Sequence, residues 1–152
     1  MTREDVTAVL ALWARLNDAG GASDERFVVR PDASADLRHI INDQWLGRFR
    51  PFPACYVCDH EGVVVGWVQG DICPPHPILD EPPKVRIGNL WVEPPYRRRG
   101  VGRTLVETFV QEAQQAGFPW VEVGTLGRDA RAVAFWRALG FGDWRVTLLR
   151  ES

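Results

Sequence analysis

Apolar side chains recur along this chain at two spacings, and the change between them separates helices from strands. A stripe at three- and four-residue intervals predicts a first helix through Val6, Val9, Leu10, Trp13 and Leu16, with Thr2 and Asp5 placed to cap its start. A second stripe predicts a helix entered through Pro31-Asp32 and left at Gly47, with Leu37, Ile40, Ile41 and Trp45 on its apolar face. Ala19-Gly20-Gly21-Ala22-Ser23, between the two, is expected to be a flexible loop.

Shorter runs with strand character fill most of the remaining chain. They cover residues 54–59, 63–72, 85–92, 119–125 and 143–150. A turn at His60-Glu61-Gly62 makes the first two a hairpin, and Pro94-Pro95 must end the third because proline gives a ladder no N–H. A third helical stripe comprises Val101, Leu105, Val106, Phe109, Val110 and Ala113. A fourth, stopped by Gly140, comprises Ala132, Phe135, Trp136 and Leu139.

This order of elements predicts an α/β sandwich around a mixed sheet. The chain has 152 residues, of which 45% are hydrophobic, and this is enough for one full core. Neither a repeat nor a low-complexity tract interrupts it, so we expect a single domain over residues 1–152. The net charge of −2 does not favour a nucleic-acid or anionic-membrane partner. Neither a leader nor a membrane-length apolar run is present, which predicts a cytoplasmic protein.

The three cysteines do not predict a disulfide framework, because their number is odd. Cys55 and Cys58 have the spacing of a metal or redox pair, but they fall within a predicted strand. Residues three apart on a strand point to opposite faces, so the two sulfurs could not share a zinc ion. His39, His60 and His76 lie in three different elements. We therefore expect no metal site.

Arg97-Arg98-Arg99-Gly100-Val101-Gly102 is the most informative stretch of the chain. The two glycines stand between a strand and a helix, where backbone N–H groups can close on an anion. The arginines and Arg103 add charged, bidentate donors that suit phosphate. A third glycine for a dinucleotide fingerprint and a Lys-Ser/Thr for a P-loop are both missing. A solvated basic face or an RNA contact is the alternative, but the domain as a whole is not basic.

Arg97-x-x-Gly100-x-Gly102 resembles the pyrophosphate signature of the GNAT superfamily of acyl-CoA-dependent N-acyltransferases. Phe135-Trp136-Arg137-Ala138-Leu139-Gly140-Phe141 resembles the second hallmark of that superfamily, a short helix ending in Leu-Gly-Phe. The resemblance implies a mixed sheet of about six strands flanked by four helices. One departure is that the first helix begins almost at Met1, which leaves the family's first strand missing or displaced.

The resemblance also implies the contacts to acetyl-CoA, the expected acyl donor. Leu90-Trp91-Val92 would offer backbone groups to the pantetheine arm and an N–H to the acyl oxygen. The residues expected to bind the donor are Leu90, Trp91, Val92, Arg97, Arg98, Arg99, Gly100, Val101, Gly102, Arg103, Asp129, Phe135 and Trp136.

Glu93 and Asp71 are the candidates for a base or amine-orienting group, with a pair of solvated carboxylates as the alternative. Trp136 occupies a position where the family often has a tyrosine, and an indole does not give up its proton as a general acid. Asp129 replaces a common Asn and could cap the last helix.

The proline-rich segment 73–83 is expected to be a rigid connection or a wall of the acceptor site. The favoured function is transfer of an acetyl group to a small primary amine by direct attack in a ternary complex. Two alternatives stay open, namely a protein or peptide N-acetyltransferase and a non-catalytic acyl-CoA-binding module. A homodimer is the assembly that we consider for this protein.

Overall fold

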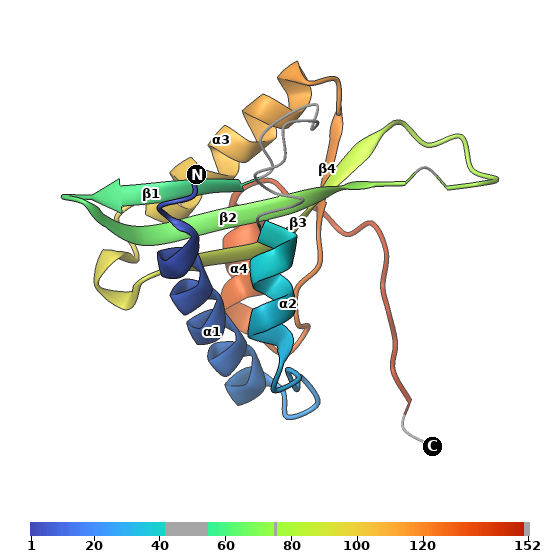
Figure 1. Ribbon diagram of the computed structural model, residues 1–152. Helices are drawn as coiled ribbons and strands as arrows, with labels where there is room; N and C mark the ends of the chain where they lie inside the picture. The colour runs from blue at the N-terminus through green and yellow to red at the C-terminus, as the bar shows by residue number, and fades with distance from the viewer. Residues whose placement is uncertain (42–54, 75, 151–152) are drawn as a thin grey trace.

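A mixed sheet with helices on both faces forms the body of the protein in this computed structural model, which describes residues 1–41, 55–74 and 76–150 (Figure 1). The helices are α1 (Val6–Ser23), α2 (Ala33–Ile40), α3 (Val101–Gln115) and α4 (Ala130–Ala138). The strands are β1 (Cys55–His60), β2 (Val63–Cys73), β3 (Lys84–Val92) and β4 (Trp120–Val123). The α/β class with four helices is confirmed. None of the helices in these ranges is long and apolar enough to cross a membrane.

The sheet has the strand order β1-β2-β3-β4. The first three strands are antiparallel, and β4 runs parallel to β3. The predicted hairpin between β1 and β2 is confirmed, with Glu61 and Gly62 both at positive φ in its turn. A short 3-10 turn at Pro94–Tyr96 follows β3, as the two prolines require.

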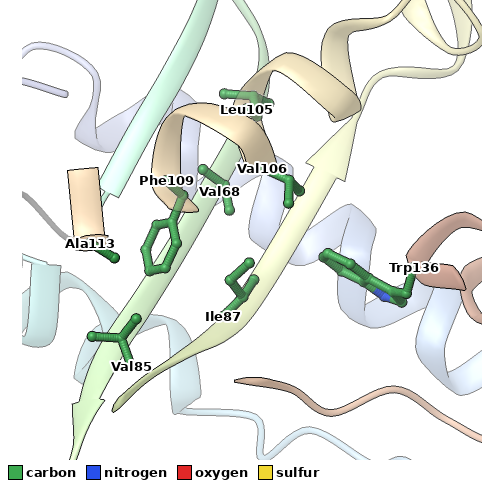
Figure 2. Packing of buried hydrophobic residues seen from close by; sticks show 8 residues of the cluster. All are labelled: Val68, Val85, Ile87, Leu105, Val106, Phe109, Ala113 and Trp136. Carbon is green, nitrogen blue, oxygen red and sulfur yellow. The ribbon is translucent and has the colours of Figure 1, made fainter. Parts of the chain in front are cut away.

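Two separate apolar clusters cover the two faces of the sheet. The first lies under α3 and α4 and comprises Val68, Val85, Ile87, Leu105, Val106, Phe109, Ala113 and Trp136 (Figure 2). The second lies under α1 and α2 and comprises Val6, Val9, Leu12, Leu37, Ile41, Cys55 and Trp67. Cys55 belongs to the second cluster, whereas Cys58 packs against the first, so the two sulfurs do lie on opposite faces.

Some expectations about the elements were wrong. Within the described residues the sheet has four strands, not about six. Residues 143–150 form no strand, although their apolar positions alternate, because no neighbouring strand pairs with them. The absence of a strand before the first helix was expected, and the described residues before α1 form none.

The loop expected at Ala19–Ser23 is the last part of α1. The ring of Phe27 packs so closely on Gly20 that a Cβ there would lie 2.8 Å from the ring, and this contact outweighs the low helix propensity of glycine. Asp5 does not cap α1 by its side chain, because its carboxylate accepts from the Thr2 N–H at 2.6 Å instead. The end expected for the second helix, at Trp45 and Gly47, lies outside the described residues.

Candidate active site

The sheet opens between β3 and β4. The two strands pair only from Lys84 opposite Trp120 to Ile87 opposite Val123, after which β4 ends and β3 continues to Val92. At the same level the register between β2 and β3 shifts, so that Gly88 is an extra residue between Ile87 and Asn89. A bulge bends a strand and strengthens its twist. The bulge and the short β4 together leave one edge of residues 88–92 open.

The backbone groups along this open edge follow from the ladder. Glu93 N–H donates to Val65 O at 2.9 Å, so in an antiparallel pattern every second residue back from Glu93 directs its N–H and C=O to β2. Leu90 and Val92 therefore direct theirs away from β2, to the open edge. The backbone of Trp91 is used within the sheet, opposite Trp67. Of the three residues expected to line the donor, Leu90 presents both main-chain groups and Val92 its N–H, because Val92 O accepts from Arg97 Nε at 2.8 Å. Trp91 presents only a side chain.

The turn that follows β3 has the geometry of an anion site. Arg98 and Gly100 both adopt left-handed conformations, with φ of 63° and 87°. Gly100 is the N-cap of α3, and no side chain in the described structure caps that end. The first N–H groups of α3, at Val101, Gly102 and Arg103, have no carbonyl partner inside the helix. They lie at its positive end, where an anion is stabilised.

The arginines of this turn do not all point the same way. The guanidinium of Arg97 lies 4.4 Å from the centre of the Trp91 ring, and its Nε donates to Val92 O at 2.8 Å. Arg99 lies over Tyr96 at 5.8 Å, and Arg103 pairs with an exposed glutamate one helical turn later. Arg97 thus ties the turn to β3 in this structure, whereas the backbone of the turn faces the anion position.

Helix α4 borders the same turn. A Cβ on Gly102 would lie 3.4 Å from the ring of Phe135 and 3.6 Å from the side chain of Val92, so these three residues meet. Trp136 points instead into the core under α3, where it is 8% exposed (Figure 2). Asp129 caps α4 as expected, since its carboxylate accepts from the N–H groups of Arg131 and Ala132 at 3.1 and 3.0 Å.

The two candidate carboxylates are not brought together. Glu93 lies beside Val65, whereas Asp71 is six residues further along β2, which is roughly 20 Å of strand. Glu93 is paired with Arg15 of α1. Asp71 stands opposite Arg86, close to the Gly88 bulge. Only one of the two can act on a given reacting atom.

Two amide side chains beside the bulge were missed by the sequence analysis. Gln69 is 1% exposed; its Oε1 accepts from Asn89 Nδ2 at 2.7 Å and its Nε2 donates to Asp71 at 2.6 Å. The signal was present in the sequence, because Gln69 and Asp71 are polar residues in an otherwise apolar strand, and Gly88 interrupts another strand. A buried amide with both ends bonded indicates a built polar site.

A family model matches most of the chain. The chain belongs to the acetyltransferase (GNAT) family, whose model matches residues 18–141. The [ribosomal protein bS18]-alanine N-acetyltransferase of Escherichia coli strain K12 is 35% identical over 68 residues. The match covers 43% of each chain, so this chain spans less than half the length of that curated relative. An uncharacterized N-acetyltransferase of Methanocaldococcus jannaschii is 28% identical over 103 residues, or 68% of this chain and 45% of that one.

Solved structures show the same fold at low sequence identity. The aminoglycoside acetyltransferase AAC(6')-Iy, in complex with a bisubstrate analogue of coenzyme A and acetylneamine, superposes with a TM-score of 0.74 at 21% identity. The superposition covers 100% of this chain and 95% of that one. A mutant of the BH1408 protein from Bacillus halodurans gives a TM-score of 0.78 at 16% identity, covering 100% and 97%.

Proposed function

We propose that this protein transfers an acetyl group from acetyl-CoA to a primary amine. The observation that carries the proposal is the open edge of β3, which ends in a turn with anion-binding geometry. A coenzyme A thioester has the matching sequence of groups, with phosphates at one end and an amide-bearing arm leading to sulfur. The phosphates would lie at Gly100–Gly102, the arm along Leu90 and Val92, and the acyl group near the Gly88 bulge.

With the thioester bound in this direction, Asp71 is a better candidate than Glu93 for the group that acts on the amine. Glu93 would lie beside the phosphate end and is already paired with Arg15, whereas Asp71 would lie near the acyl group. An ammonium group held by Asp71 gives up its proton, and the neutral nitrogen then attacks the thioester carbonyl carbon. The C–N bond forms, the C–S bond breaks, and the thiolate leaves with a proton from the amine or from water. A backbone N–H of the open edge would stabilise the oxyanion.

The acceptor is proposed to be a small molecule. The chain superposes over its whole length on an aminoglycoside acetyltransferase, and this favours that class. A protein or peptide amine is the second candidate, favoured by the 35% identity to the enzyme named for ribosomal protein bS18. The third candidate is an acyl-CoA-binding module without turnover.

One experiment separates these three candidates. Purified protein is given acetyl-CoA and a panel of amines, amino acids, aminoglycosides, polyamines and peptides, and free thiol is followed. Saturating acetyl-CoA should also raise the melting temperature, since a ligand at a hundred times its Kd adds about 2.7 kcal/mol. Binding without amine-dependent thiol release would select the third candidate. Absence of both binding and turnover would exclude all three.

We also propose that the protein forms a homodimer through residues 146–150. Trp144 packs edge-on against Trp120 at 5.2 Å, and Arg145 pairs with Glu81 at 2.5 Å, which fixes the start of this segment. Beyond it Val146 and Leu148 are 78% and 89% exposed, and the segment leaves the sheet (Figure 1). Exposed apolar residues with strand alternation suit pairing with a second copy. Sedimentation of a V146K/L148K variant, with V63K at the exposed first residue of β2 as control, would test this.

A further inference from the structure

Gln69 is a buried polar residue that the fold does not need for packing. It occupies a strand position between Val68 and Gly70, where an apolar side chain would be expected, and burying an amide without partners is costly. Both ends of its carboxamide are bonded, one to Asn89 and one to Asp71. The bonds join three polar residues of two strands across the level at which β3 leaves β4. A polar chain at this position suggests a role beyond stability.

The three hydrogen-bonded residues lie on one face of the sheet. Trp67, Gln69 and Asp71 are spaced two residues apart on β2, so their side chains point to the same face of the sheet. Trp67 belongs to the cluster under α1 and α2, so this is the α1/α2 face. Asn89 is directly opposite Gln69 and shares it. The anion-binding turn leads into α3, whose core side is the other face. A donor lying in the open edge could therefore be approached by an acceptor from the α1/α2 face, where Asp71 stands.

The backbone leaves space for this arrangement. Gly88 is the extra residue of the bulge, and a Cβ there would lie 3.1 Å from Gln69 Oε1, closer than most side chains allow. The amide oxygen of Gln69 thus rests against the bulge itself. Because Gln69 touches both the bulge and Asp71, it fixes the position of the carboxylate relative to the open edge of β3.

The charged residue opposite Asp71 on β3 is already paired with a residue of β4. Arg86 is opposite Asp71 in the ladder, and its Nε donates to Glu122 at 2.7 Å on the neighbouring strand. Much of the charge of Arg86 is thereby balanced by Glu122. The Gln69 amide donates to Asp71 at 2.6 Å, and this hydrogen bond holds the carboxylate beside the bulge.

We propose that Gln69 is a positioning residue that holds the Asp71 carboxylate for the incoming amine, with Asn89 fixing the orientation of the Gln69 amide. This inference rests on the proposed function. It assigns Asp71 to the acceptor side of the reaction and predicts that the acceptor is cationic when it arrives. The proton then passes from the ammonium group to Asp71, and the neutral amine attacks the thioester.

The experiment measures amine turnover and acetyl-CoA binding in the same variants. Gln69→Met keeps the length of the side chain and removes both hydrogen bonds, and Gln115→Met, at the exposed end of α3, is the matched control. For Gln69→Met, kcat/KM for the amine should fall roughly ten- to a hundredfold, the range for a lost hydrogen bond to a charged group. The Kd for acetyl-CoA should change less than about twofold, because the phosphate turn is untouched. Gln115→Met should match the wild type in both.

A double variant distinguishes positioning from a general loss of structure. If Gln69 acts through Asp71, Q69M/D71N should be no worse in kcat/KM than Asp71→Asn alone. If the fold losses in kcat/KM of the two single variants multiplied in the double variant, the proposal would be overturned. Full amine turnover by a folded Gln69→Met protein would also overturn it. Should Gln69→Met fail to fold, Asn89→Leu applies the same test from the other end of the chain of bonds. A wild type that binds acetyl-CoA but acetylates no amine would instead refute the proposed function.

Discussion

Replacing Trp136 by alanine should destabilise the protein strongly, because the indole fills the core between α3 and α4. Trp136 is 8% exposed and lies edge-on to Phe135 and Phe141, with ring centres 5.1 and 5.3 Å away. Truncating a buried aromatic residue to alanine costs about 3–5 kcal/mol, and the small exposed fraction places this site at about 3–4 kcal/mol. For a domain of this length, that corresponds to a fall in Tm of roughly 10 °C.

The assay is thermal unfolding followed by circular dichroism, with a matched tryptophan as control. Trp144→Ala removes the same side chain at a position that is 56% exposed and touches one aromatic ring, and should cost about 1 kcal/mol or less. A Trp136→Ala protein that melts no lower than Trp144→Ala would refute the packing argument.

The tyrosine variant at the same position examines chemistry separately from packing. Trp136→Tyr retains an aromatic ring in the cluster, so we expect it to fold and to bind acetyl-CoA. It should also keep amine-dependent turnover, since an indole does not give up its N–H proton as a general acid and Trp136 is expected to act by packing. A folded Trp136→Tyr protein that binds acetyl-CoA but has lost all turnover would show that the indole itself takes part.

Three further predictions concern other parts of the molecule. Gly102→Val should weaken coenzyme A binding in a folded protein, because the added methyl groups would meet Phe135 beside the phosphate turn, and calorimetry would show it. Gly70→Ala should destabilise by about 1–3 kcal/mol in chemical unfolding, since its Cβ would lie 2.4 Å from the ring of Phe109. Burial, with a smaller contribution from Glu112, raises the pKa of Tyr56 to about 12. The unfolded phenol loses its proton first, so stability should fall as pH rises from about 10 to 12, and Tyr56→Phe should flatten this dependence.

The sequence predicted the local structure of this protein better than its pairing. Helices α3 and α4, the β1–β2 hairpin and the end of β3 followed from periodicity and from proline and glycine positions, which act within a few residues. The alternation in residues 143–150 also indicated a strand. A strand, however, exists only when a second one lies beside it, and no local pattern states whether it does. The helical end of α1 depended in the same way on Phe27, a residue beyond that end.

The features of the candidate site that depend on neighbouring residues were also easier to predict than those that depend on strand pairing. The turn at Gly100 before α3 and the cap at Asp129 were predicted because each depends on the backbone next to it. The opening between β3 and β4 was not predicted, because it depends on how far these two strands, distant in sequence, stay paired. The polar position of Gln69 was visible in the sequence, but its pairing with Asn89 was not, because the two residues are twenty apart. Glu93 and Asp71 were grouped because each was expected at the end of a strand, and the antiparallel pairing of β2 and β3 places those two ends far apart.

The division of the core into two clusters has a consequence for how this protein can change. Val68 and Trp67 are neighbours in sequence, yet one packs under α3 and the other under α1, so the two halves share little beyond the strands between them. Substitutions that reshape the α1 and α2 side can be absorbed there, while the phosphate turn keeps its support from α3 and α4. Directed evolution toward new amines should therefore concentrate its libraries on the α1/α2 half and leave the other half constant.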